Sequence, residues 1–341
     1  MITIKDVAAA AQVSIKTVSR VLNDEVSVSD ATRQHVQAVI DQLGYVPNLS
    51  ARRLKSGKSR SLALVLPLVT SSYASKLLSC VLAEARSHGY SLLVLEDRIE
   101  EPDGLKFIKR TILDRQADGL LIAPPGADNP QLIEFVRERD VPLVLITPNL
   151  SDPSYSSIEV TDRKGGYEAT RYLLELGHRR IAHITTLKSE QFSQERLAGY
   201  LDALQEAGLP LDASLIREGQ NTVESGYDAA LALLDCPQPP TALFAGNDET
   251  ALGAMNAFWQ RGLRVPEDIS LVGFDDAPIA RQIFPALTTV SQAIDEIARV
   301  AVNKLVGAVE GHSVETESLP VSTRLIIRQS CAPRVVANQQ K

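Results

Sequence analysis

The sequence has few of the residues that build disulfide frameworks or membrane spans. Its 341 residues include three cysteines, two methionines and one tryptophan, and aromatic residues make up only 5%. Cys80, Cys236 and Cys331 are far apart and without CxxC spacing, which argues against a disulfide framework or a cysteine metal site. No run approaches the roughly 18 apolar residues that span a bilayer, and the start MITIKDVAAA lacks the order of a signal peptide. We therefore expect a cytoplasmic protein without membrane association.

Motifs for catalysis are missing as well. The five histidines have no metal-ligand spacing, and the chain contains no GxSxG, no HExxH and no paired nucleophile and base. The segment Gly57-Lys58-Ser59 copies the end of a phosphate-binding loop, but Arg52 stands where that loop requires glycine. We expect no catalytic residues, no metal and no cofactor, and hence no enzyme.

The charge is unevenly distributed along the chain. A net charge of -7 would by itself argue against a nucleic-acid partner. The first 60 residues, which we call the head, carry nine Lys or Arg against five Asp or Glu. The body, residues 61–341, carries 26 bases against 37 acids. A basic head on an acidic body favours contact between the head and DNA.

Helical patterns fill the first 45 residues. Thr3 is a candidate N-cap of a helix that runs to about Ala11, Ser14 caps a second helix, and a third opens at Ser29 and closes at Gly44. A tight turn joins the first two helices, which predicts a helix-turn-helix unit whose second helix enters the major groove. The alternative is a small helical bundle with no DNA to bind.

The body alternates apolar runs with helical stretches. The runs are LALVLP, SLLVLE, GLLIAP, VPLVLIT, RIAHIT, TALFAG and ISLVGF. Continuous apolar strands with helical crossovers predict parallel sheets covered on both faces, and seven such strands fit two doubly wound lobes better than one. We expect the chain to cross between the lobes near Val160–Arg163, Thr288–Ser291 and Leu319–Ser322. A ligand would bind in the cleft between the lobes, at the carboxyl ends of the strands.

Two stretches of the head carry a family resemblance. TIKDVAAAAQVSIKTVSRVLN and VSDATRQHVQAVIDQLGYVPNLSARRL resemble the head and hinge of the lactose/galactose repressor (LacI/GalR) family along their full length. The body motifs LLELGHRRIAHIT, ERLAGYLDALQEAGL, PTALFAGNDETALGAMNA, RVPEDISLVGFDDAP and PALTTV resemble the family's effector domain, which is related to periplasmic sugar-binding proteins. Together these motifs cover nearly the whole chain.

The resemblance implies an all-α helix-turn-helix head followed by two periplasmic-binding-protein-like α/β lobes. It implies a homodimeric transcriptional repressor of operator DNA, controlled by a small effector, a sugar or related metabolite, between the lobes. The alternative is a sugar-binding protein with a vestigial head. The expected domains are a DNA-binding domain at 1–46, a hinge helix and linker at 47–60, and an effector-binding and dimerisation domain at 61–341. Lobe 1 would span about 61–160 and 291–319, and lobe 2 about 161–290 and 320–333.

The resemblance also assigns DNA contacts. Ile15 and Lys16 match the positions where the family varies its base readout. The neighbouring groove-facing positions are Thr17, Ser19, Arg20 and Asn23. Positions that usually hold phosphates correspond to Thr3, Ser14, Thr32 and Tyr45. In the hinge, the expected contacts are Asn48, Ala51, Arg52 and Leu54, with Leu54 wedged between base steps. Gln12 departs from the family, which usually has glycine in this turn, so we expect some backbone strain there.

For the effector, Arg196 and Asp248 match positions that commonly hydrogen-bond a ligand's hydroxyl groups. Asp248 also has a competing interpretation as a helix N-cap, and Arg196 one as a solvated surface arginine. Further cleft candidates are Ser72, Tyr73, Thr147, Phe192 and Asn221, and Asn221 replaces an aromatic residue found in many family members. The tail CAPRVVANQQK has no leucine heptads, which favours a dimer over a tetramer. The sequence leaves open the identity of the effector, the sign of its effect on DNA binding, the operator sequence, and whether the oligomer is a dimer or a tetramer.

Overall fold

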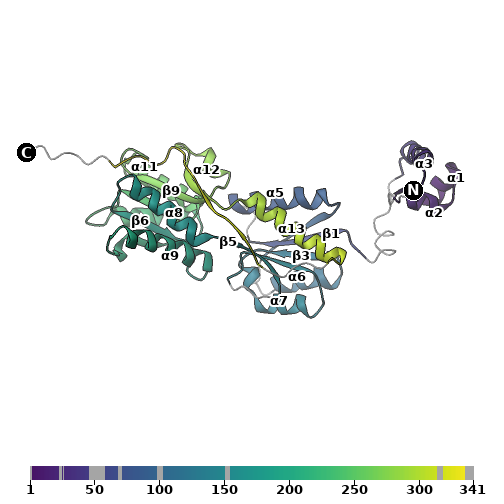
Figure 1. The fold of residues 1–341 in the computed structure, drawn as a ribbon, viewed down its shortest axis with the longest axis horizontal. Helices are drawn as coiled ribbons and strands as arrows, with labels where there is room; N and C mark the ends of the chain where they lie inside the picture. Colours follow the sequence, from purple (N-terminus) through teal and green to yellow (C-terminus); the bar gives the residue numbers. More distant parts are fainter. Residues whose placement is uncertain are drawn as a thin grey trace, which may run out of the picture. The chain divides into compact units, whose positions relative to one another are not determined.

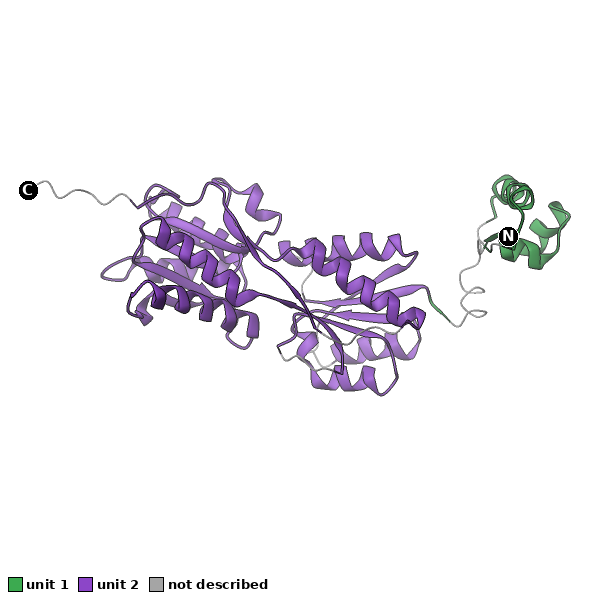
Figure 2. Ribbon diagram, viewed as in Figure 1, with its two compact units in different colours: residues 1–59 green, residues 60–341 purple. Residues whose placement is uncertain are grey.

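The computed structural model describes residues 2–22, 25, 27–45, 58–67, 71–97, 103–149, 154–312 and 318–334. It divides into two compact units, residues 1–59 and residues 60–341, which Figure 2 shows in different colours. The first unit corresponds to the head and the second to the body. Each is described by itself below.

The head contains the three expected helices, α1 (Ile4–Ala10), α2 (Ile15–Leu22) and α3 (Asp30–Leu43). Their local signals act as predicted. Thr3 donates its N–H and its hydroxyl to the Asp6 carboxylate at 2.7 and 2.8 Å, which closes a capping box and lowers the pKa of Asp6. Gly44 ends α3 in the left-handed region with φ 60°. The small core holds Val7, Ala8, Ala11, Val18, Val21, Val36 and Ile40.

The turn between α1 and α2 forms despite the missing glycine. Gln12 takes φ 52°, a left-handed conformation that is unfavourable for a residue with a Cβ atom. The N–H of Val13 still donates to the carbonyl of Ala8 at 3.0 Å. The expected strain is therefore located at Gln12, and the turn survives it.

The first lobe of the body is built on a fully parallel sheet of order β11-β5-β4-β3-β1-β2 (Figure 1). Its strands are β1 (Ser61–Leu66), β2 (Ser91–Glu96), β3 (Gly119–Ile122), β4 (Leu143–Ile146), β5 (Ser156–Val160) and β11 (Leu319–Val321). One apolar cluster packs α5 (Ser72–Ser87) and α13 (Ile294–Glu310) on the sheet. A second packs α6 (Gly104–Leu113) and α7 (Pro130–Arg137) on it. Successive side chains of β1 point to opposite faces of the sheet, so Leu64 belongs to the first cluster and Val65 to the second.

The second lobe has the order β12-β10-β9-β8-β6-β7, parallel except for β12. Its strands are β6 (Ile181–Thr185), β7 (Ile216–Glu218), β8 (Ala242–Ala245), β9 (Ser270–Asp275), β10 (Thr288–Ser291) and β12 (Arg324–Ile326). The covering helices are α8 (Asp162–Glu175) and α9 (Gln191–Glu206), and α10 (Val223–Leu234) and α11 (Asp248–Gln260). A short α12 (Ile279–Gln282) follows β9. The predicted pair of doubly wound lobes is confirmed.

The chain crosses between the lobes at three places in the described residues. β5 leads into α8, β10 leads into α13, and β11 leads into β12. The first and third crossings are tied together, because the N–H of Thr323 donates to Oγ1 of Thr161 at 2.9 Å. The last crossing lies after Val321, because β11 pairs with β5 through Val321 and Val160. Within the described ranges, no helix is both long and apolar enough to cross a membrane.

Candidate DNA-binding face and effector site

The outer face of α2 is polar and basic. Val18 and Val21 turn into the head core, with exposed fractions of 0% and 6%. The opposite side presents Ile15, which is 45% exposed, and Lys16, which is also exposed. Thr17, Ser19 and Arg20 are half-buried on the same helix. The helical period of α2 thus brings five of the six expected base-reading residues into one element, and Asn23 lies outside the described residues.

Three of the four expected phosphate contacts lie at helix N-termini. Thr3 caps α1 and Thr32 lies in the first turn of α3, where it hydrogen-bonds Ser29. The Ser14 hydroxyl accepts the N–H of Thr17 at 3.0 Å, so it caps α2. Helix N-termini attract phosphates because their backbone N–H groups have no partner within the helix.

The remaining expected DNA contacts are less informative. The ring of Tyr45 packs half-buried against the head core. The hinge candidates Asn48, Ala51, Arg52 and Leu54 lie outside the described residues. Their assignment stays a prediction from the sequence.

Arg196, on α9, is buried in the second lobe, with a side chain that is 5% exposed. Its Nε donates to Oδ1 of Asp162 at 2.7 Å, and its Nη1 donates to the carbonyl of Gly246 at 2.7 Å. The guanidinium lies 3.7 Å from the ring centroid of Phe274 and 4.9 Å from that of Phe192. The interpretation of Arg196 as a solvated surface residue is wrong, because carboxylates and aromatic rings replace water around it.

Asp248 is also buried, but it is not the N-cap of α11. Asn247 caps that helix, since its Oδ1 accepts the N–H of Thr250 at 2.9 Å. The carboxylate of Asp248 is fully buried and accepts the Thr289 hydroxyl at 2.6 Å and the N–H of Ala277 at 2.8 Å. Burial, followed by the charge of Asp275, raises the pKa of Asp248 well above its usual value. The cap position was therefore wrong by one residue.

Asp275, which the sequence reasoning missed, lies at the end of β9 beside Arg196. The two side chains approach to 3.6 Å, and Nε2 of Gln292 donates to the Asp275 carboxylate at 2.5 Å. Burial raises the pKa of Asp275 to about 7. Its φ of 114° is strained for a residue with a side chain, and such strain tends to occur at binding sites. An available signal was the acidic pair that directly follows the apolar run ISLVGF, at the carboxyl end of a strand.

Tyr73 of the first lobe directly follows Ser72, whose hydrogen bonds to Glu249 and Ile279 reach the second lobe. It is half-buried on α5, and its pKa is raised by burial and then by the charge of Asp275, while the charge of Arg196 opposes this shift. The charges of Arg196 and Asp275, which lie in the second lobe, therefore act on the phenol of Tyr73 in the first lobe. We call Arg196, Asp162, Asp275, Phe192 and Tyr73 the Arg196 cluster.

Two further groups of hydrogen bonds join the lobes. The N–H of Ser72 donates to the Glu249 carboxylate at 2.6 Å, and the Ser72 hydroxyl accepts the N–H of Ile279 at 3.2 Å. In the second group, the N–H of Gln191, at the start of α9 in the second lobe, donates to the side chain of Asn149, which follows β4 in the first lobe. Nδ2 of Asn149 lies 3.5 Å from Glu190. Of these residues, the sequence had indicated only Ser72.

Two sequence candidates remain apart from the Arg196 cluster. Thr147 follows β4 with φ 46°, and Asn221 precedes α10 with φ 60°. Both are half-buried, and neither side chain hydrogen-bonds another residue in the described part of the chain. Among the described residues, no hydrogen bond or ion pair joins either of them to Arg196.

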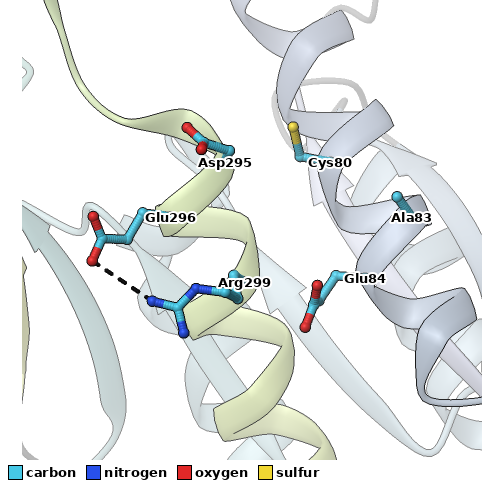
Figure 3. Close-up of a pocket in the computed structure, with 6 residues that line it drawn as sticks. All are labelled: Cys80, Ala83, Glu84, Asp295, Glu296 and Arg299. Carbon is cyan, nitrogen blue, oxygen red and sulfur yellow. Dashed lines mark ion pairs between the residues drawn. The ribbon is translucent and has the colours of Figure 1, made fainter.

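A hollow of about 550 Å³ lies elsewhere, between α5 and α13 of the first lobe (Figure 3). It is lined by Cys80, Ala83, Glu84, Asp295, Glu296 and Arg299, of which Glu296 and Arg299 form an ion pair at 3.7 Å. None of the expected ligand-binding residues lines it. Over the described ranges, no group of three or more His, Cys, Asp or Glu side chains is placed to hold a metal ion.

Comparison with known proteins places both parts of the chain. A family model described as "Bacterial regulatory proteins, lacI family" matches residues 3–48, and a "Periplasmic binding protein-like domain" matches residues 170–331. The HTH-type transcriptional repressor CytR of Escherichia coli K12 is 34% identical over 329 residues, which are 96% of each chain. The probable HTH-type transcriptional repressor ExuR of Bacillus subtilis is 32% identical over 335 residues, 97% of this chain and 98% of the relative.

Solved structures give the same result. The lac repressor dimer bound to operator and the anti-inducer ONPF has a TM-score of 0.83 and 29% identity, covering 97% of this chain and 99% of that chain. The transcriptional regulator CelR in complex with cellobiose has a TM-score of 0.74 and 31% identity, covering 97% and 100%.

Proposed function

Because the chain belongs to the lacI family of bacterial regulatory proteins, it is a DNA-binding transcriptional regulator, and we propose that a small ligand bound between the lobes controls it. Two repressors align with the chain over almost their whole length, so the chain is a repressor of the same architecture. In the proposed division of labour, residues 1–46 read DNA, residues 47–60 form the hinge and residues 61–341 bind effector and partner subunit.

One observation carries the ligand proposal, the burial of Arg196 among carboxylates and rings at the boundary between the lobes. Guanidinium and carboxylate groups bond hydroxyl groups strongly, and aromatic rings accept the apolar face of a sugar. CelR is known with cellobiose, and an Enterococcus faecium member with bound ribose also matches this chain, with a TM-score of 0.72. We therefore propose that the effector is a sugar or related metabolite, held by Arg196, Asp275 and Tyr73.

The bridges between the lobes supply a route for control. A ligand at the Arg196 cluster would add contacts to the arrangement in which Ser72 bonds Glu249 and Asn149 bonds Gln191. A ligand shifts an equilibrium between lobe arrangements only through its differential affinity for them. Coupling of roughly 1–3 kcal/mol is typical of allosteric proteins and changes an affinity by about 5- to 150-fold.

The chain would act as a homodimer in the cytoplasm, where its operator is. Trp259 and Phe284 in the second lobe are 83% and 91% exposed, which is unusual for large apolar side chains and suits burial against a second subunit. We propose no enzymatic activity, because the relatives are transcriptional repressors.

The test is selection of binding sites from random duplexes by the full chain, repeated with each of a panel of sugars and nucleosides. A regulator enriches one near-palindromic sequence, and its effector changes the affinity for that sequence. If no sequence is enriched, the vestigial-head alternative replaces this proposal.

A further inference from the structure

Arg20, a groove-facing residue of α2, has an acidic partner within the head. Its Nε lies 3.4 Å from Oε2 of Glu25, and the two side chains are 40% and 46% exposed. Lys16 lies on the same helix and is exposed, but no described carboxylate forms an ion pair with it. The two basic residues of the reading face therefore differ in their surroundings.

The position of Glu25 is fixed by contacts with two helices. Its N–H donates to the carbonyl of Arg20 at 3.0 Å, at the end of α2. Its own carbonyl accepts Nη2 of Arg33, on α3, at 2.8 Å. The Ser27 hydroxyl lies 3.5 Å from the Glu25 carboxylate. The backbone of Glu25 thus holds its carboxylate next to Arg20.

The geometry of the pair leaves the reading atoms of Arg20 available. The shortest contact joins Oε2 of Glu25 to Nε of Arg20, and among the described residues neither terminal nitrogen of the guanidinium has a hydrogen-bond acceptor, so both can donate in parallel. Two parallel donors are what a bidentate contact to O6 and N7 of guanine requires. The carboxylate also offsets the charge of Arg20, which reduces its attraction to phosphates at any sequence.

We propose that Glu25 is a specificity-determining residue that positions Arg20 for one base pair and weakens its binding to nonspecific DNA. The inference rests on the DNA-reading function of the head. It assigns to Glu25, a residue outside the reading helix, a share in the choice of operator sequence.

The experiment compares the full chain with Glu25→Gln, which keeps the size and the backbone contacts of the residue and removes its charge. The matched control is Asp41→Asn, because Asp41 is an exposed acid on α3 that accepts a hydrogen bond from Gln37, and among the described residues it forms no ion pair with Arg20. Arg20→Gln identifies the base pair that Arg20 reads. Site selection from random duplexes measures base preference, and fluorescence anisotropy on a duplex of unrelated sequence measures nonspecific affinity against salt.

Glu25→Gln should tighten nonspecific binding about two- to fivefold, the scale of an exposed ion pair. The logarithmic dependence of this affinity on salt should steepen by up to about 0.9, as for one added phosphate contact. Base preference should weaken at the same base pair that Arg20→Gln affects. Glu25→Asp, which restores a carboxylate, should recover part of it.

Three results would overturn the role of Glu25. Asp41→Asn could reproduce the changes, which would reduce them to net charge. Glu25→Gln could change the nonspecific affinity by the same factor in a chain that also carries Arg20→Gln, which would mean that Glu25 does not act through Arg20. Glu25→Gln could also leave the base preference of the chain unchanged. If the unmodified chain itself selects no sequence, the DNA-reading function is wrong as well. If it selects a sequence but one of the three results above is found, only the role of Glu25 is wrong.

Discussion

The head and the body treat charged side chains in opposite ways. On the reading helix of the head, Lys16 is exposed and Arg20 is half-exposed beside Glu25. In the second lobe of the body, Arg196 and Asp275 are almost completely withdrawn from water. A surface that meets a highly charged polymer such as DNA gains from charges left in solvent, whereas a ligand site gains from charges that are already desolvated and oriented. As a consequence, the stability of the body depends on each partner of the buried ion pairs, because removal of one partner leaves the other charge buried and uncompensated.

The largest expected effect is the loss of the buried Arg196 charge. Arg196→Met keeps the apolar stem but leaves Asp162 and Asp275 without their cation, so the body should lose about 3–5 kcal/mol of unfolding free energy. Urea unfolding followed by circular dichroism measures this loss. The control is Arg171→Met, which breaks the exposed 3.1 Å pair with Glu175 and should cost below about 1 kcal/mol. Equal losses in the two variants would remove the contrast between buried and exposed charge.

A smaller effect is expected in the turn of the head. Gln12→Gly removes the Cβ atom that disfavours φ 52° and should stabilise the head by about 1 kcal/mol. Gln12→Ala keeps a Cβ atom and should give little or none of this gain. Thermal unfolding of both variants measures the difference. A Gly variant no more stable than the Ala variant would show that Gln12 is not strained.

The effect that separates the two regions by sign is the pH dependence of stability. Asp275 holds its proton in the folded chain up to a pKa of about 7, whereas the ordinary value is 3.8. Between about pH 4 and 7 the folded body therefore binds the extra proton, and the contribution of Asp275 to stability falls as pH rises. In the head, Thr3 lowers the pKa of Asp6 below 3.8, so that contribution is lost instead as pH falls.

His183 must be separated from this comparison. Burial lowers its pKa from 6.5 to about 4, so its contribution to stability rises with pH over nearly the same range. The informative quantity is thus the free energy of unfolding of the unmodified chain minus that of Asp275→Asn, measured at several pH values. This difference should decrease from pH 4 to 7. A constant difference would mean that Asp275 is ionised throughout.

Local signals predicted the three helices in the described part of the head. A cap is made by residues three positions apart, as for Ser14 and Thr17, so it is visible in a short window of sequence. The seven apolar runs likewise predicted seven strands of the body, because each strand is a continuous apolar stretch that is visible in a short window of sequence. The interpretation of Asp248 as an N-cap failed by one position, because Asn247 and Asp248 are both capping residue types and their backbone conformation decides between them.

The Arg196 cluster was only partly predictable. Arg196 and Phe192 came from a family resemblance, but their neighbours came from the fold. Asp162 follows β5, Asp275 ends β9 and Gln292 follows β10, and each is an ordinary polar residue at the end of a strand in the sequence. β9 and β10 are neighbouring parallel strands of the second lobe, so Asp275 and Gln292 lie at the same edge of its sheet. Asp162 reaches them from the start of α8, after the chain has crossed from β5 of the first lobe.

By itself, then, the sequence determined the three helices of the head and their caps, seven strands of the body, the basic head and the family, because each of these is encoded in neighbouring residues or in long similar stretches. The tertiary structure alone decided that Arg196 is buried and that Asp275 shares its charge. It also decided that Ser72 in the first lobe bonds Glu249 in the second, 177 residues further along the chain. Burial and ion pairing depend on which distant segments meet, and only the packed fold specifies that meeting.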